Sequence, residues 1–251
     1  MRTPLFSCVV PVKGERPYFA EAIDSLRGQG LGEDLEIIVQ DGDVEPDNGQ
    51  SDALNRGFAK AKGEWLFWLN ADDVLLPRAL DKVTALMNRM NGLKWITGNS
   101  IYFNACGEIV EVRTDARWHS WFGKKLDVWT GGPSSFFRRD VWMEYGGADT
   151  DLKYVMDIDL WTRWAKKSIK FESVEAYIWG FREHDGSKTF SGRNSGALIK
   201  ERAVVDVRHD VQSSGFWRYV NRCASVIDGT WLMRKLDTNR FKGKCWKEIL
   251  V

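Results

Sequence analysis

The sequence predicts an α/β protein with a Rossmann-like, mostly parallel central sheet flanked by helices, and with a helical C-terminal extension. Up to residue 92, apolar runs of β character alternate with segments of helical periodicity. Strands separated by helices of about 10–15 residues indicate βαβ units and therefore a parallel sheet. From residue 195 onward the pattern is mostly helical. The composition, 43% hydrophobic and 28% charged, is that of an ordinary globular protein.

Three strands and three helices alternate in the first part of the chain. Each helix begins near a proline or a capping side chain and ends at a glycine. In a parallel sheet the ends of the strands share one edge, and ligands of open α/β sheets bind there. The expected strands span residues 6–12, 35–41 and 64–70, and the helices span residues 16–30, 51–63 and 77–92.

The second part of the chain has a different order of elements. Two strands joined by a short turn are expected at residues 94–103 and 107–114, followed by a strand at 134–139. A helix at 154–168 precedes a long strand at 171–184. The length suits one large domain, or one domain plus an appendage.

Charge is distributed unevenly. The chain carries a net charge of +1, which gives no indication of a nucleic-acid partner, but residues 195–251 hold 11 basic and 6 acidic residues. This basic extension contains Trp217, Trp231 and Trp246. It could lie on an anionic membrane surface, pack on the body, contact a second copy in a homodimer, or form a solvated helical face.

Cysteine usage and apolar runs bear on the compartment. The four cysteines are widely spaced and form no CxxC pair, which disfavours a zinc site and a disulfide framework. The sequence shows neither the apolar stretch of a signal peptide nor a run of about 18 apolar residues. We therefore expect a cytoplasmic protein, at the inner face of the membrane if the extension binds lipid.

Two adjacent carboxylates, Asp72 and Asp73, follow the third strand. Mg²⁺ and Mn²⁺ prefer carboxylate oxygens and commonly share substrate phosphates. The alternative is that one of the pair caps the helix that starts near Pro77. Asp41 ends the neighbouring strand, where it could accept a hydrogen bond from a nucleobase or belong to a turn. Lys13 ends the first strand and could meet a phosphate, or be a solvated loop lysine.

Residues 46–73, PDNGQSDALNRGFAKAKGEWLFWLNADD, resemble the core signature of family 2 glycosyltransferases, which have the GT-A fold. CVVPVKGERPYFAEAIDSLRGQ is similar to the first strand and helix of that family. GGPSSFFRRDVWMEYGG, YVMDIDLWTRWA and FREHDGSKT resemble its acceptor-side segments, so the resemblance covers about residues 5–190. It implies an inverting transfer from a nucleotide-diphosphate sugar, with a UDP-sugar as the expected donor, to a hydroxyl of a glycan or lipid-linked glycan.

The resemblance also implies residue roles. Asp41 would bind the base in a pocket lined by Pro11 and Val12, and the segment from Asp52 to Asn55 would lie close to the nucleotide. Asp72 would hold the ribose and Asp73 a Mn²⁺ or Mg²⁺ ion. One departure affects these roles: only three residues separate Asp43 from Asp47, where the family usually has a longer segment. We therefore expect a smaller nucleotide-binding side than the family usually has, and the base that family members prefer does not predict the base that this protein prefers.

An inverting transfer needs a general base for the acceptor hydroxyl. Asp159 has Arg163 four residues later, which suits a salt bridge, whereas Asp157 has Trp161 at that spacing and is the better base candidate. The family pattern also places its base at Asp157. The alternative is that both aspartates only stabilise the dipole of the helix.

FREHDGSKT carries donors suited to a departing diphosphate. Arg182 and Lys188 are expected to bind the nucleotide sugar, because cations stabilise the developing negative charge. His184 could complete the metal's ligands or contact phosphate. Acceptor contacts are expected from Gly131 to Arg138 and from the aromatic stretch at residues 117–125.

The resulting prediction is a metal-dependent glycosyltransferase acting in surface polysaccharide biosynthesis. Its catalytic domain would span residues 1–194, with a nucleotide-sugar half up to about residue 115 and an acceptor half over 116–194, and the extension would span 195–251. Two rivals remain. A nucleotidyltransferase would need a Gly-rich loop after the first strand, and a non-catalytic sugar-binding module would be expected to lose Asp73 or Asp157.

Overall fold

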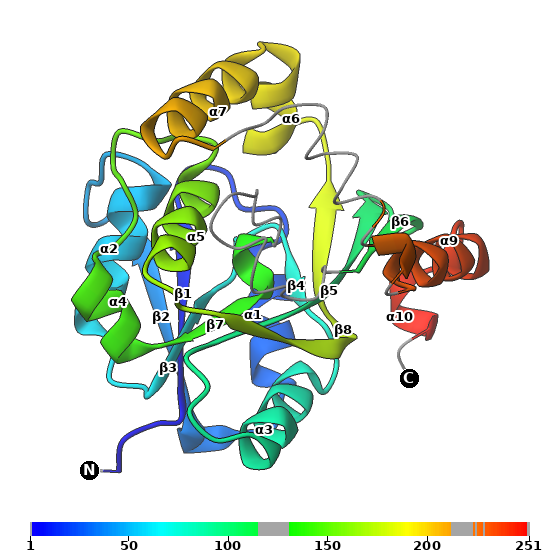
Figure 1. Cartoon of the computed structure of the whole chain (residues 1–251), viewed down its shortest axis with the longest axis horizontal. Helices are drawn as coiled ribbons and strands as arrows, with labels where there is room; N and C mark the ends of the chain where they lie inside the picture. The colour runs from blue at the N-terminus through cyan, green and yellow to red at the C-terminus, as the bar shows by residue number, and fades with distance from the viewer. Residues whose placement is uncertain (1, 115–130, 212–222, 224, 228, 250–251) are drawn as a thin grey trace.

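The computed structural model describes residues 2–114, 131–211, 223, 225–227 and 229–249. An eight-stranded sheet forms the centre of the molecule, with helices packed on both faces (Figure 1). The strands are β1 (Phe6–Val12), β2 (Leu35–Asp41), β3 (Trp65–Trp68), β4 (Val74–Leu75), β5 (Trp95–Asn104), β6 (Ile109–Arg113), β7 (Ser135–Arg138) and β8 (Phe171–Glu183). The α-helices are α1 (Phe19–Arg27), α2 (Gln50–Lys60), α3 (Ala79–Arg89), α4 (Arg139–Tyr145), α5 (Met156–Lys166), α6 (Lys188–Asn194), α7 (Ala197–Arg208), α9 (Thr230–Phe241) and α10 (Trp246–Ile249).

The strand order is β2-β1-β3-β7-β5-β8-β4, and β6 pairs with β5. β1 pairs in parallel with both β2 and β3, and β5 pairs in parallel with β8. β7 lies between β3 and β5 and runs antiparallel to both. β4 pairs antiparallel with β8, and β6 pairs antiparallel with β5. The α/β class is confirmed; parallel pairing occurs among the first three strands and between β5 and β8, and the remaining pairs are antiparallel. The later strands return through hairpin and long-range pairings that break the βαβ order.

The two faces of the sheet are covered by different helices because alternate residues of a strand point to opposite sides. Val9 of β1 packs in a cluster with α2, α4 and α5, whereas Phe6, Cys8 and Val10 of the same strand pack with α1 and α3. All seven residues of β1 are buried. The strand is therefore a rigid central element whose carboxyl end, at Val12, is well placed to position a site.

An aromatic cluster packs β3, β5, β7 and α5 together. Trp161 of α5 stacks on Trp68 of β3 and on Trp95 of β5, with ring centroids 5.7 and 4.8 Å apart. Phe137 of β7 meets Trp161 and Trp164 edge to face at 6.0 and 5.0 Å. Aromatic pairs in these geometries add about 0.5–1.5 kcal/mol each beyond burial. The cluster fixes α5, and with it Asp157, relative to the strand that leads into Asp72.

Among the described residues, the C-terminal extension is helical and packs on the body. Tyr177 of β8 donates a hydrogen bond to Asp237 of α9 at 2.6 Å, and Trp246 of α10 stacks on Phe103 at 5.6 Å. Figure 1 shows α9 and α10 beside β6, away from α2 and α4. Of the alternatives raised by the sequence, packing on the body is therefore present. No helix among these described residues is long and apolar enough to cross a bilayer. The division at residue 194, and that into halves at about 115, stays a prediction.

Asp159 joins α5 to the end of α7. Its side chain is 1% exposed and contacts Arg163 at 2.9 Å, Arg208 at 3.1 Å and His209 at 2.8 Å. The predicted Asp159–Arg163 salt bridge is thus confirmed. Burial alone would raise the pKa of Asp159, but the hydrogen bonds from His209 and Arg163 hold it below its usual value.

We expect Asp159→Ala to lower the free energy of unfolding by about 2 kcal/mol, because it leaves Arg163, Arg208 and the buried His209 without the buried carboxylate that accepts their hydrogen bonds. Urea denaturation would measure the change, with the exposed Asp151→Ala as the control. Since the pKa of Asp159 is lowered on folding, its stabilisation should be present at neutral pH and be lost as the pH falls through that lowered value. Equal unfolding free energies for the two variants would contradict this role.

Candidate functional site

A pocket lies where the carboxyl ends of β1 and β3 meet the segment that follows β8. It encloses about 340 Å³. The strand-end residues Pro11, Val12 and Asp72 line it, as the sequence predicts, and His184 and Lys188 close it from the other side. Its remaining lining residues are Lys13, Glu15, Arg16, Pro17, Tyr18, Asp47, Gly49, Gln50, Ala53, Asn70, Ala71, Phe181, Gly186, Ser187 and Thr189.

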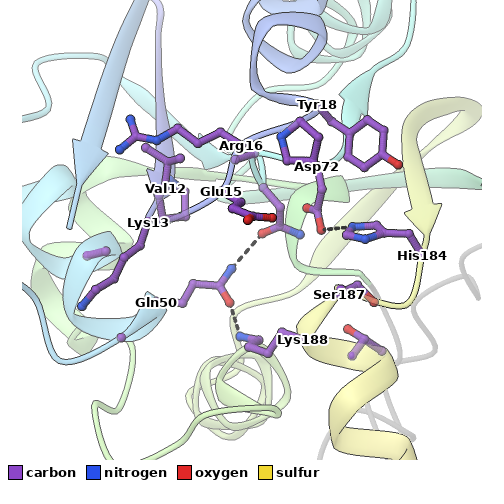
Figure 2. A pocket seen from close by; sticks show the side chains of 18 of the residues that line it. Val12, Lys13, Glu15, Arg16, Tyr18, Gln50, Asp72, His184, Ser187 and Lys188 are labelled. Carbon is purple, nitrogen blue, oxygen red and sulfur yellow. Dashed lines mark hydrogen bonds and ion pairs between the residues drawn. The ribbon is translucent and has the colours of Figure 1, made fainter. Parts of the chain in front are cut away.

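Asp72 and His184 form the pair best suited to a metal. Asp72 Oδ2 lies 3.0 Å from His184 Nε2, and the two side chains point toward one another in the pocket (Figure 2). The His184 ring contacts the edge of Tyr18, which fixes its orientation. Among the described residues no group of three or more His, Cys, Asp or Glu side chains could hold a cation. The pair fits an ion that takes its other ligands from a diphosphate and water, as Mg²⁺ and Mn²⁺ commonly do.

Asp73 lies beneath the pocket, contrary to its predicted role as the metal ligand. It is 0% exposed and does not line the pocket. Its Oδ2 accepts hydrogen bonds from Asn70 Nδ2 at 2.7 Å and Trp179 Nε1 at 3.1 Å, and its Oδ1 accepts one from the Arg182 backbone at 3.0 Å. Burial, then repulsion from Asp72, raises its pKa well above the usual value. Asp73 therefore joins the turn after β3 to β8.

Arg182 also lies beneath the pocket instead of facing a phosphate. Its side chain is 4% exposed and its guanidinium lies over the rings of Tyr18 and Phe103, at 4.2 and 4.7 Å from their centroids. Nε donates to the Asp72 carbonyl at 2.9 Å, and Nη2 pairs with Glu21. The residue predicted to bind the nucleotide sugar instead fixes the backbone that carries Asp72.

The N-terminus of α2 opens into the pocket. Gly49 precedes it with φ 113°, a conformation that side chains disfavour, and Gln50 donates a hydrogen bond to Asn70 Oδ1 at 2.7 Å and accepts one from Lys188. Free N–H groups at such a helix start attract anions. A phosphate would therefore be well placed here.

Asp52 and Asn55, predicted to lie at the nucleotide, do not line the pocket. Asp52 accepts a hydrogen bond from the Asn48 backbone at 3.0 Å and pairs with Arg56 at 2.9 Å. Asn55 exchanges two hydrogen bonds with the backbone of Ala148, at 2.8 and 2.9 Å. Both hold α2 to its surroundings, while Gln50 and Ala53, three residues apart on one face, line the pocket instead.

Asp157 and Lys188 interact electrostatically; Lys188 lines the pocket, whereas Asp157 is not among its lining residues. Asp157, in the first turn of α5, is half-buried, and burial raises its pKa. Its carboxylate accepts a hydrogen bond from the Ile158 backbone at 2.9 Å and interacts with the Gly132 backbone and with Lys188. Burial lowers the pKa of Lys188 to about 8, although Asp157 and Asp72 both act in the opposite direction. Lys188 is thus within electrostatic reach of both carboxylates.

The expected acceptor contacts fall in two places. The segment from Gly131 to Arg138 forms a buried 3-10 turn and β7, and Gly132 lies directly against Trp68 with no room for a Cβ. The aromatic stretch at 117–125 lies outside the described residues, as does Trp217. Of the two segments predicted to contact the acceptor, only Gly131 to Arg138 lies among the described residues, and its Gly132 backbone interacts with Asp157.

Comparison with known proteins identifies the family. The sequence model of the family described as glycosyl transferase family 2 matches residues 44–137. An uncharacterized glycosyltransferase of Rickettsia typhi is 26% identical over 220 residues, covering 76% of this chain and 68% of the relative. Over these residues the chain is similar to the family 2 glycosyltransferases. The resemblance recognised in the sequence, and the enzyme class that it implies, are thereby confirmed.

Two solved structures show that this glycosyltransferase has the GT-A fold. S. aureus TarS in complex with UDP-GlcNAc superposes with a TM-score of 0.58 at 13% identity, over 80% of this chain and 65% of TarS residues 1–349. The mannosyltransferase PcManGT from Pyrobaculum calidifontis, in complex with GDP-Man and Mn²⁺, superposes with a TM-score of 0.53 at 17% identity. The match covers 83% of this chain and 63% of the PcManGT chain. The chain spans 39% of a longer TarS chain.

Sequence reasoning missed several pocket residues of the glycosyltransferase. Gln50 and Asn70 link Lys188 to the turn after β3, and Arg16 and Tyr18 form the wall opposite α2. A signal for Gln50 was available, because it directly follows the glycine that starts α2. No local signal indicates Arg16, whose partners Asp41 and Asp43 lie 25 and 27 residues away.

Proposed function

We propose that the protein is an inverting glycosyltransferase that moves a sugar from a nucleotide-diphosphate sugar to a hydroxyl of a glycan or lipid-linked glycan. The observation that carries this proposal is the arrangement around Lys188. Lys188 lines the pocket and is within electrostatic reach of both Asp72 and Asp157. A carboxylate suited to a metal and a carboxylate of raised pKa thus lie within reach of one lysine: Asp72 lines the pocket, and Asp157 lies behind its lining. This arrangement suits direct displacement at a sugar carbon.

A UDP-sugar is the proposed donor and Mn²⁺ or Mg²⁺ the proposed cofactor. Structural neighbours that bind UDP-GlcNAc, or GDP-Man with Mn²⁺, support these choices. We assign the ion to Asp72 and His184, in place of Asp73, because these two side chains face the pocket at 3.0 Å. When bound, the cation would neutralise the negative charge that develops on the departing diphosphate. The start of α2 would add backbone N–H groups for the same charge.

Asp157 is the proposed general base. Its carboxylate takes the proton of the acceptor hydroxyl while that oxygen bonds to the anomeric carbon, and the bond from this carbon to the diphosphate oxygen breaks. Attack from the side opposite the leaving group inverts the configuration. The protonated Lys188 and the Gly132 backbone hold the carboxylate in place until the proton transfers.

We propose a cytoplasmic place of action, at the inner face of the membrane, in surface polysaccharide biosynthesis. Support for the membrane contact comes from α9, where Leu232, Met233 and Leu236 are 51–59% exposed. Exposed Arg234 and Lys235 lie on the same helix. Apolar and basic side chains together favour an anionic lipid surface. A contact between two copies of the chain through this helix is the alternative.

Thermal-shift measurements and product analysis would test the function. With Mn²⁺, at least one nucleoside-diphosphate sugar is expected to raise the melting temperature, since a ligand that binds only the folded protein stabilises it. Turnover of that donor should release the nucleoside diphosphate. Release of pyrophosphate would instead indicate a nucleotidyltransferase. Binding without turnover on any hydroxyl acceptor, or no binding by any donor, would contradict the proposal.

A further inference from the structure

Arg16 and two aspartates form a closed cluster at the end of the pocket away from His184. Arg16 Nη1 donates to Asp41 Oδ2 at 2.6 Å, and Nη2 donates to Asp41 Oδ1 at 3.1 Å and to Asp43 Oδ2 at 2.7 Å. Nε donates to the Gly14 carbonyl at 3.2 Å. Four of the five N–H groups of the guanidinium are thus satisfied. Among the described residues, none accepts the second N–H of Nη1.

The same contacts occupy Asp41. Each of its oxygens accepts from Arg16, and Oδ1 also accepts from the Asp43 backbone at 3.0 Å. Asp41 does not line the pocket, whereas Arg16 does. A neutral N–H of a base would have to displace a bidentate, charge-assisted pair, which is about twice as strong as a neutral hydrogen bond. Asp41 is therefore poorly placed to read a base itself.

The rest of the pocket places the base at this cluster. In the proposed function, Asp72 and His184, which are in contact at 3.0 Å, bind the diphosphate end, and Lys188 with Asp157 lies at the sugar and acceptor side. Figure 2 shows Arg16 and Lys13 extending to the opposite side, past Val12 at the end of β1. β1 lies between β2 and β3, and this change in strand order is where nucleotides bind in open α/β sheets.

We infer that Arg16, clamped by Asp41 and Asp43, contacts the nucleobase of the donor, and that Asp41 acts only by holding Arg16. The inference rests on the proposed function and adds a specificity residue to it. The free N–H of Nη1 would donate to a carbonyl or ring nitrogen on the edge of the base, and the fixed planar guanidinium offers a face for stacking. In this arrangement the cationic Arg16 side chain recognises hydrogen-bond acceptors on the edge of the base.

Affinities of UDP, CDP, GDP and ADP, each with Mn²⁺, would test the assignment. Arg16→Lys keeps the charge but loses the planar fork, and Arg16→Ala removes both. In both variants the nucleotide that binds best to the wild-type protein is expected to lose about tenfold or more in affinity, and the other three are expected to lose less. The differences in affinity among the four nucleotides should therefore become smaller. Arg27→Ala, on α1 with a 72% exposed side chain, is the matched control and should leave all four affinities unchanged.

A double-mutant cycle separates Arg16 from Asp41. Asp41→Asn should weaken binding in the wild-type background and have no further effect in the Arg16→Ala background. Tighter binding by Arg16→Ala, with a full effect of Asp41→Asn in that background, would show that Asp41 reads the base and would overturn the inference. An equal loss for all four nucleotides would do so too, because it would indicate a phosphate contact. If the wild-type protein binds none of the four, the proposed function fails instead.

Discussion

Asp72→Asn is expected to reduce sugar transfer by about 100–1000-fold and to abolish the dependence of donor binding on Mn²⁺. The substitution keeps the shape of the side chain and can retain the contact with His184, but it removes the negative charge that a hard cation requires. The side chain is 32% exposed in the pocket, so the fold should tolerate the change. Titration of donor affinity against Mn²⁺ concentration measures the effect separately from turnover.

Two variants serve as controls for Asp72. Asp24→Asn removes an exposed carboxylate on α1 and should leave metal dependence unchanged. Asp73→Asn should lower the unfolding free energy, because three donors converge on that buried carboxylate, while donor binding in the protein that remains folded should still respond to Mn²⁺. If metal dependence were lost in Asp73→Asn and retained in Asp72→Asn, the assignment of the metal ligand would be reversed.

Asp157→Asn is expected to retain donor binding and to lose about 100–10,000-fold in transfer, the usual contribution of a general base. The amide oxygen can still accept the hydrogen bond from Ile158, so the helix start is preserved. Donor affinity by calorimetry and single-turnover rates would separate binding from chemistry. Asp151→Asn, on the exposed loop before α5, is the control. Unchanged turnover in Asp157→Asn would remove this residue from the mechanism.

The pH profile gives a second measurement of the same site. Because burial raises the pKa of Asp157, transfer should increase with pH through a value above the ordinary carboxyl range, as the base ionises. Because the pKa of Lys188 is lowered to about 8, transfer should decrease again as the pH rises beyond that value and the ammonium is lost. Lys188→Met should remove the alkaline decrease along with most of the activity. Transfer that does not decrease as the pH rises through about 8 would contradict the Lys188 assignment, and transfer that does not decrease as the pH falls through the carboxyl range would contradict that of Asp157.

Much of the fold could be predicted because local patterns encode it. The runs at residues 6–12 and 35–41 match β1 and β2 to the residue, since each is a short stretch of β-forming residues with clear polar ends. The two-residue β4 could not be found in this way, because its identity depends on pairing with Gly180 and Trp179 of β8. The insertion of β7 between β3 and β5 likewise depends on contacts far apart in sequence.

The site was predictable in position but not in the orientation of each side chain. Strand ends correctly indicated Val12 and Asp72, because parallel strands deliver their last residues to one edge. Which of two adjacent aspartates faces the pocket depends on the turn from Asn70 to Asp73, and no periodicity describes that turn. The capture of Asp41 by Arg16 is set by the tertiary structure, since 25 residues separate them.

The stacked tryptophans have a consequence for observing the enzyme at work. Trp68 lies four residues before Asp72, and its partner Trp161 lies four residues after Asp157. Indole rings 5.7 Å apart share their excited states, so the near-ultraviolet circular dichroism of the pair depends on their mutual angle. A shift of the donor side against the acceptor side would change that angle. The protein therefore contains its own label-free optical reporter of movement across the site.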